Sequence, residues 1–382
     1  MRVLLANEQR DVVGGMETYL RWLAPELLAR GHQLVCVTRY PQTGRETWVP
    51  AGATAVVADS SAALADAAHG CSIGLLSPLG SVDLEDALAR AIPSVLFAHT
   101  FYGTCVSGSK MHAFPTKRPC SRRMGLACLC LYGPRRCGGA NPLTAVRLYA
   151  RESARAALLP CFRKILVASR YMAHEYERHG VGPDIVQVVP YPVQRPATPP
   201  AIRFRRRVVF IGRMTPLKGV ELLIEAIGPL SRRGERLELH FAGDGPVKAE
   251  VEARARRAGI AATFHGWLPQ EQTTTLLREG GVLALPSTWP EPFGLVGLEA
   301  TAQGIPVVAF DVGGIREWLV PGVNGEIAPA EPPTAEGLAA ALERALDPGR
   351  WSSLSAGAFA TAARFAPAAH LEAIEETLRN AS

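Results

Sequence analysis

Two apolar runs, GVLAL at 281–285 and PVVAF at 306–310, enclose the stretch that most constrains the fold. Between them, Pro290 and Pro292 oppose helix formation, and Gly294 precedes a run of helix-forming residues. The predicted order is strand, loop, helix, strand, which is typical of a parallel sheet whose ligands bind where the strands end. Because the first N–H groups of such a helix are unpaired, they can hold a phosphate.

Two glutamates flank the start of this predicted helix. Glu291 precedes the helix. Glu299 lies about two turns into it, with seven residues between the two glutamates. Alone, such a pair is most often two exposed side chains. The surrounding EPFGLVGLEA, however, resembles the E-x7-E signature of the retaining glycosyltransferases of the GT-B fold, family 4. The resemblance implies an α/β protein with two Rossmann-like domains facing a central cleft, and transfer of a sugar from a nucleotide-diphosphate donor to an acceptor hydroxyl.

The segment GRMTPLKG at 212–219 carries two cations at a predicted strand-to-helix turn. Arg213 and Lys218 are well placed there to neutralise a diphosphate, although exposed charge is the simpler interpretation of either residue alone. The segment resembles the family's donor-diphosphate motif, GR-x(3,4)-K-G. The resemblance therefore assigns Gly212, Arg213 and Lys218 to donor binding.

The loop after the first predicted strand, 2–7, contains Gly14, Gly15 and Glu17. It lacks a G-x-G-x-x-G pattern, so the sequence gives no support for a nicotinamide or flavin cofactor. A Gly-Gly pair alone most often marks a turn. Since the family carries GG-x-E at this point, the resemblance places the backbone of Gly14 and Gly15 near the donor phosphates or the acceptor.

His99 follows a predicted strand at 94–98. Ligands bind beyond the ends of parallel strands, yet a single histidine is more often structural than catalytic. The family commonly has a histidine here that contacts the transferred sugar. The resemblance further implies that Glu291 stabilises positive charge at the anomeric carbon, that Glu299 binds the ribose, and that no metal is required. The remaining donor-binding residues that it implies are Asp244, Trp267, Leu268, Phe293, Gly294 and Leu295.

A chain of 382 residues has room for two domains with separate cores. The segment PYPVQRPATPP at 190–200 resists helix and central strand, so it predicts a linker with a boundary near 195. We therefore expect an acceptor-binding domain at 1–195, a nucleotide-sugar-binding domain at 196–365 and, by analogy with the fold, a helix at 366–382 that packs on the first domain. The predicted strands of both domains lie at 2–7, 34–38, 53–58, 73–76, 94–98, 164–169, 185–189, 207–212, 237–242, 264–268, 281–285 and 306–310.

An insertion at about 101–140 is rich in Cys, Arg, Pro and Gly. Clustered cysteines in a cytosolic chain favour metal ligation, but C-x-C is a poor zinc signature. A structural zinc or iron–sulfur site, a disulfide-containing loop and reduced thiols all stay open. The cysteines concerned are Cys105, Cys120, Cys128, Cys130 and Cys137.

Positive charge is concentrated in the first half of the chain. Residues 1–195 hold 22 Lys and Arg against 14 Asp and Glu, and residues 101–170 hold 13 against one. This segment predicts contact with an acceptor diphosphate or with acidic lipid head groups. Few aromatic residues accompany the charge, so we expect no nucleic-acid partner.

The longest apolar runs fall short of the ~18 residues of a membrane helix, and the apolar stretch at the N-terminus is too short for a secretory signal. We therefore expect a cytoplasmic protein, placed by its basic loop at the inner face of the membrane. The donor is a UDP-, GDP- or ADP-sugar, and the acceptor is a glycan, a lipid-linked saccharide or a small molecule, in polysaccharide, glycolipid or natural-product biosynthesis. The alternatives are an epimerase or phosphorylase of the same fold, or a metal-binding or redox protein on this scaffold.

Overall fold

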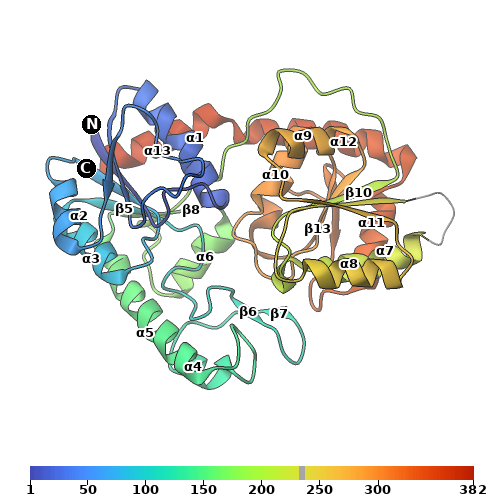
Figure 1. Ribbon diagram of the computed structural model, residues 1–382, viewed down its shortest axis with the longest axis horizontal. Helices are drawn as coiled ribbons and strands as arrows, with labels where there is room; N and C mark the ends of the chain where they lie inside the picture. The colour runs from blue at the N-terminus through green and yellow to red at the C-terminus, as the bar shows by residue number, and fades with distance from the viewer. Residues whose placement is uncertain (232–236) are drawn as a thin grey trace. The chain divides into compact units, whose positions relative to one another are not determined.

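The computed structural model describes residues 1–231 and 237–382, which form two compact units (Figure 1). Unit 1 consists of residues 1–109, 122–190 and 368–382. Unit 2 consists of residues 110–121 and 191–367. The end of the chain thus belongs to the unit in which the chain begins, and a short piece of the basic insertion belongs to unit 2.

Unit 1 is built on a seven-stranded parallel sheet of order β3-β2-β1-β4-β5-β8-β9. Its strands are apolar along most of their length, which is the pattern of strands covered on both faces. In the interior strand β1 every residue after Arg2 is buried. The strands are β1 (Arg2–Asn7), β2 (Gln33–Thr38), β3 (Thr54–Val57), β4 (Ile73–Leu76), β5 (Ser94–Phe97), β8 (Lys164–Val167) and β9 (Val186–Val188).

Helices connect these parallel strands, and polar residues fix where several of them begin. The Ser169 hydroxyl accepts from Met172 N at the start of α6, and Asn141 Oδ1 accepts from Leu143 N at the start of α5. The helices of unit 1 are α1 (Gly15–Ala29), α2 (Ser61–Ala68), α3 (Val82–Ala91), α4 (Ala127–Tyr132), α5 (Pro142–Leu158), α6 (Arg170–Arg178) and α13 (Pro367–Ala381), of which Pro367 falls in unit 2.

Unit 2 has a six-stranded parallel sheet of order β12-β11-β10-β13-β14-β15. Figure 1 shows α9, α10 and α12 on one face of this sheet and α7 and α8 on the other. The strands are β10 (Arg207–Ile211), β11 (Glu238–Ala242), β12 (Ala262–Gly266), β13 (Val282–Leu285), β14 (Val307–Phe310) and β15 (Gly325–Ala328). The helices are α7 (Val220–Ser231), α8 (Lys248–Arg257), α9 (Gln270–Arg278), α10 (Leu295–Ala302), α11 (Ala335–Ala345) and α12 (Pro348–Ala362).

The prediction of an α/β protein with two parallel sheets is confirmed, and every predicted strand has a counterpart. Three strands were not predicted. Strand β15 begins at Gly325, and β6 (Met111–His112) and β7 (Arg118–Pro119) form a hairpin inside the insertion. Within the described residues, the helices lack the combined length and apolar character that crossing a membrane requires.

Candidate active site

Lys218 and Glu291 form an ion pair beyond the carboxyl ends of β10 and β13. Lys218 Nζ lies 2.6 Å from Glu291 Oε1, and the Ser287 hydroxyl donates to the same oxygen at 2.5 Å. Glu291 is buried, and the lysine ammonium lies 5.6 Å from the centre of the Trp289 ring. An ammonium has three N–H donors, so Lys218 can hold Glu291 and still offer donors to an anion.

Close backbone approaches fix the two loops that carry this pair. A Cβ on Gly219 would lie 1.9 Å from Pro286 O, so only glycine permits the loop after β10 to pack against the loop after β13. Gly314 N donates to Glu291 O at 2.7 Å, and a Cβ on Gly313 would lie 2.2 Å from that oxygen. The backbone of Glu291 is therefore held from the loop after β14 as well.

Arg213 is exposed and follows Gly212 directly after β10. The turn after β11 packs tightly on this segment: Met214 N donates to Asp244 O at 2.8 Å, and a Cβ on Gly243 would lie 2.0 Å from Gly212 O. Asp244 is exposed, and its Oδ1 accepts from Gly245 N at 2.7 Å. In the structure this carboxylate thus orders its own turn.

Helix α10 begins directly after Glu291-Pro292-Phe293. Gly294 has φ 80° and ψ 51° and is its N-cap, and Gly297 N makes the first helical hydrogen bond to Gly294 O. The N–H groups of Leu295 and Val296 precede that bond and have no partner within the helix. The side chain of Phe293, in contrast, is buried and packs on Tyr191 and Phe365, so only its backbone is available to a ligand.

Glu299 lies on α10 and is half-buried. Burial raises its pKa to about 7, and a hydrogen bond with the Gln270 side chain opposes that shift. Near neutral pH this carboxyl can therefore either donate or accept. Two other predicted residues, Trp267 and Leu268, follow β12, and Trp267 is 75% exposed.

The predicted histidine of unit 1, His99, lies beyond the carboxyl end of β5, and Ser77, beyond the end of the neighbouring strand β4, contacts it. His99 Nε2 lies 3.0 Å from the Ser77 hydroxyl, and its ring stacks on Phe97 at 4.5 Å. Burial lowers the pKa of His99 to about 3, so the imidazole is neutral at physiological pH. A neutral ring can donate through one nitrogen and accept through the other.

The glycine loop lies at the end of the neighbouring strand β1. Gly14 is the N-cap of α1, and both Gly14 and Gly15 are exposed. Glu17, in the first turn, is buried and accepts from Asn7 Nδ2 at 3.1 Å. Glu17 therefore joins the end of β1 to the start of α1, and the two glycines are the accessible part of this loop.

Models of two glycosyltransferase families match most of the chain. The model described as glycosyl transferase 4-like domain matches residues 14–192, and the model described as glycosyl transferases group 1 matches residues 202–355. The chain belongs to the GT-B glycosyltransferases of family 4.

Relatives match the chain over part of its length. It is 34% identical over 142 residues to the alpha-D-kanosaminyltransferase of Streptomyces kanamyceticus, covering 37% of this chain and 36% of that protein. It is 33% identical over 232 residues to the D-inositol 3-phosphate glycosyltransferase of Frankia alni, covering 54% of this chain and 56% of that protein. The chain thus spans between about a third and just over half of the length of these two relatives.

The fold matches a solved structure over the whole of both chains. The crystal structure of Anabaena Alr3699/HepE in complex with UDP and glucose superposes with a TM-score of 0.72 at 18% identity, covering 100% of both chains. At this level of identity the likeness concerns the fold.

The cysteines of the insertion are not gathered into a set of three metal ligands in the described residues. Neither do three His, Cys, Asp or Glu side chains gather as metal ligands elsewhere in the part of the chain that the structure describes. The structure also divides the cysteines, because Cys120 belongs to unit 2 and Cys105 and Cys137 to unit 1. Cys128 and Cys137 pack on a small cluster around Tyr132.

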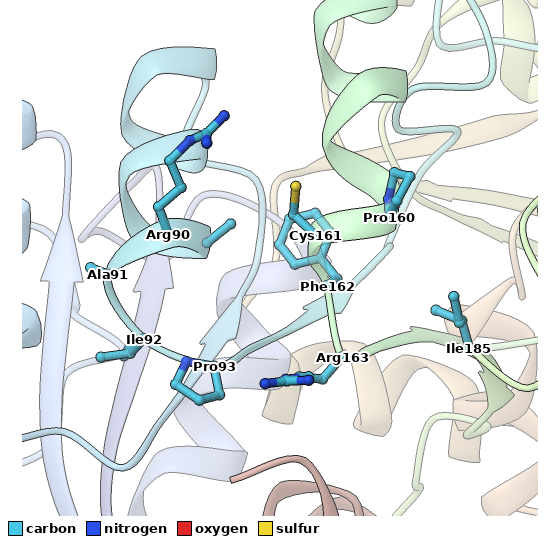
Figure 2. Close-up of a pocket in the computed structure, with 10 residues that line it drawn as sticks. Arg90, Ala91, Ile92, Pro93, Pro160, Cys161, Phe162, Arg163 and Ile185 are labelled. Carbon is cyan, nitrogen blue, oxygen red and sulfur yellow. The ribbon is translucent and has the colours of Figure 1, made fainter.

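A pocket of about 440 Å³ lies at the opposite edge of the unit 1 sheet (Figure 2). Pro93, Arg163 and Ile185 line it and directly precede β5, β8 and β9, so it lies at the amino ends of these strands. Figure 2 shows Arg90 on one wall and Cys161 on the other. Since ligands of parallel sheets bind at the carboxyl ends, we do not assign this pocket to the glycosyltransferase reaction.

Four contact residues of the candidate site were not predicted. Ser287 and Trp289 lie in the loop beside Glu291, and their position directly after a buried strand is a signal that could have identified them. Ser77 likewise follows β4. Gln270 reaches Glu299 from another helix, and no local pattern indicates that contact.

Proposed function

We propose that this protein transfers a sugar, with retention of anomeric configuration and without a metal ion, from a nucleotide-diphosphate sugar to an acceptor hydroxyl. Residues 196–365 bind the donor, residues 1–195 bind the acceptor, and the helix at 366–382 belongs to the acceptor domain. The observation that carries the proposal is the Lys218–Glu291 pair beside the N-terminus of α10.

Charge stabilisation on the leaving diphosphate is the first requirement of this reaction. Arg213 supplies a planar fork of donors, Lys218 a compact charge, and α10 the N–H groups of Leu295 and Val296. These groups are preorganised hydrogen-bond donors, and such donors stabilise the transition state most where negative charge develops. They replace the divalent cation that a diphosphate leaving group otherwise needs.

Glu291 acts on the opposite charge, the positive charge that develops at the anomeric carbon. The bond from that carbon to the β-phosphate oxygen breaks, the acceptor oxygen forms the new bond on the same face, and the acceptor proton passes to the departing phosphate. Glu291 positions the sugar hydroxyls and His99, as a neutral ring, contacts the transferred sugar. Glu299 holds the ribose.

The acceptor is a glycan, a lipid-linked saccharide or a small molecule, and the protein works in the cytoplasm at the inner face of the membrane. The support is electrostatic: residues 101–170 carry 13 basic residues and one acidic residue. Such a segment attracts anionic head groups or an acceptor diphosphate, and salt weakens this attraction.

The donor is tested by thermal shift of the purified protein with UDP-, GDP- and ADP-sugars in EDTA. We expect one nucleotide series to raise the melting temperature, and Arg213→Ala to abolish that shift. Arg256→Ala, which changes an exposed arginine on α8, is the matched control and keeps the shift. Absence of a shift with all three series contradicts the proposal.

Stereochemistry and metal dependence are tested on the active donor. Proton NMR of the product reports the anomeric configuration, and inversion contradicts the retaining mechanism. Turnover in EDTA within about twofold of turnover in Mg²⁺ supports metal independence, and loss of more than tenfold contradicts it.

A further inference from the structure

A hairpin from the basic insertion is part of unit 2. Residues 110–121 belong to that unit, whereas the chain up to Ser109 and from Arg122 belongs to unit 1. Strands β6 and β7 pair antiparallel, and Cys120 N donates to Lys110 O at 2.7 Å. The hairpin therefore enters and leaves unit 2 at adjacent points.

Met111 of this hairpin packs on the loop that carries Glu291. Its side chain is 4% exposed, and its sulfur lies 3.8 Å from the Thr288 hydroxyl. Thr288 also binds the other site loop, since its N–H and its hydroxyl donate to Leu217 O at 2.9 and 3.3 Å. Met111 thus covers the residue that joins the Lys218 loop to the Glu291 loop.

A second contact of the hairpin reaches the helix after the diphosphate motif. Lys117 Nζ lies 3.9 Å from Glu221 Oε2, and the two side chains are 30% and 20% exposed. Glu221 lies in the first turn of α7, three residues after Lys218. The two contacts therefore fall on both sides of Lys218: one at Leu217 through Thr288, the other at Glu221.

We propose that hairpin 110–121 positions the diphosphate-binding loops of the donor site. It rests on the donor assignment made above. Met111 and Lys117 act through Thr288 and Glu221, and neither of them touches the nucleoside diphosphate. Because the Lys218 and Glu291 loops lie after different strands, their separation depends on the side chains packed across them. A displacement of about 1 Å at a site of this kind costs on the order of 10²-fold in rate.

The positioning role predicts a loss in turnover that exceeds the loss in donor affinity. Lys218 and Glu291 stabilise charge that grows in the transition state, so loosening their loops lowers kcat more than it raises KM. A hairpin that only adds to the fold would change the melting temperature and leave kcat and KM of the folded enzyme unchanged. The two roles are thus separated by steady-state kinetics.

The first experiment reverses the charge of Lys117 in the full chain. With donor hydrolysis as the assay, we expect Lys117→Glu to lower kcat about three- to fivefold, as like charge now faces Glu221. The matched control is Arg256→Glu, a charge reversal on an exposed residue of α8 outside the hairpin, which leaves kcat within about 1.5-fold. Adding Glu221→Lys to Lys117→Glu restores most of the loss. An equal effect of the two single changes, or no recovery in the double variant, overturns the proposal.

The second experiment removes the contact at Thr288 and then the hairpin. We expect Met111→Ala to lower kcat about tenfold, and replacement of residues 111–119 by Gly-Gly to lower it at least as much. Binding of UDP, GDP, ADP and inorganic pyrophosphate is measured on the same proteins by calorimetry. If the shortened chain does not fold, the kcat values of Met111→Ala and Lys117→Glu test the proposal instead. Full kcat in the folded variants overturns the proposal.

Arg213→Ala separates this proposal from the donor assignment. If Arg213→Ala weakens nucleotide binding while the hairpin variants keep full kcat, the hairpin proposal alone fails. If Arg213→Ala leaves nucleotide and pyrophosphate binding unchanged, the donor assignment fails, and the hairpin proposal with it.

Discussion

Lys218 and Glu291 are 73 residues apart in the sequence and lie 2.6 Å apart in the structure. Their loops follow neighbouring strands, β10 and β13, of one parallel sheet. One charge of the pair suits a departing phosphate, and the other suits a sugar that becomes positive. The two charges required by the proposed reaction are therefore adjacent in the structure.

Removal of the Glu291 carboxylate separates chemistry from binding. We expect Glu291→Gln and Glu291→Ala to lower kcat at least about 100-fold with donor affinity changed less than about threefold, because the carboxylate acts on charge formed in the transition state. Ser287→Ala, which removes only the hydroxyl that donates to Glu291, is the milder control, and we expect it to lower kcat about three- to tenfold. Donor hydrolysis and calorimetry measure both quantities. Unchanged turnover in Glu291→Gln would refute the assigned role.

Gly219 offers a test of the close approach between the two site loops. Gly219→Ala places a Cβ 1.9 Å from Pro286 O, so we expect the loops to move apart, turnover to be lost and stability to fall by about 2 kcal/mol or more. Gly259 has the same φ of 66°, but a Cβ there meets nothing within 4 Å.

Gly259→Ala is therefore the matched control, because it carries the strain of the left-handed backbone without the clash. We expect it to cost about 1 kcal/mol and to leave kcat unchanged. Urea unfolding and donor hydrolysis distinguish the two variants. Equal losses of turnover would show that the contact between the loops has no part in the site.

The sequence predicts the core strands of both sheets because parallel strands buried on both faces are continuous apolar runs. Ile73–Leu76 agrees to the residue with β4, and the segment from 281 to 310 folds as strand, loop, helix and strand. The family assignment from EPFGLVGLEA and GRMTPLKG is likewise confirmed. The roles of Arg213, Lys218, Glu291, Glu299 and His99 stay predictions.

The elements that the sequence did not predict depend on contacts between distant segments. Strand β15 has only four residues and begins with glycine; its pairing with β14 requires that Gly325 has no Cβ, since one would lie 1.9 Å from Val307 O. The hairpin strands have two residues each, too few to show an alternating pattern. The hairpin contacts unit 2 through Met111 and Lys117, whose partners Thr288 and Glu221 lie more than a hundred residues further along the sequence.

Glu299 predicts a pH dependence of nucleotide binding. Its pKa is raised to about 7 by burial, so at pH 6 the carboxyl is mostly protonated in the free protein. Ribose hydroxyls that donate to Glu299 favour the charged form and lower this pKa. Nucleotide affinity therefore rises between pH 6 and pH 8, by up to about tenfold for one unit of pKa shift.

The control for this pH dependence is Glu299→Gln, which keeps the shape and cannot ionise. A nucleotide phosphate also titrates near pH 6, and its contribution is common to both proteins. Calorimetry at pH 6, 7 and 8 should show a steeper rise in affinity for the unmodified protein. Parallel curves would exclude the ribose contact of an ionised Glu299.

His370 and His99 predict that unit 1 loses stability in acid. Burial lowers the pKa of His370 to about 4 and that of His99 to about 3, while the unfolded chain takes up protons near pH 6.5. Below pH 6.5 the unfolded state thus binds more protons than the folded state, and stability falls with pH. Each histidine contributes about 1.4 kcal/mol per pH unit until its folded pKa is reached.

His370→Gln isolates one of these contributions. His370 lies between the Tyr19 hydroxyl at 2.9 Å and Pro190 O at 2.7 Å, so at pH 7.5 the variant should be less stable than the unmodified protein. As pH falls from 6.5 to 5 the difference should shrink by about 1 to 2 kcal/mol, because glutamine does not need to be kept neutral. Urea unfolding at each pH measures it, with His174→Gln, whose side chain is 76% exposed, as the comparison at an exposed histidine. If the difference in stability between His370→Gln and the unmodified protein does not change with pH, His370 is protonated in the folded state at pH 5. The prediction that it is buried as a neutral ring would then be wrong.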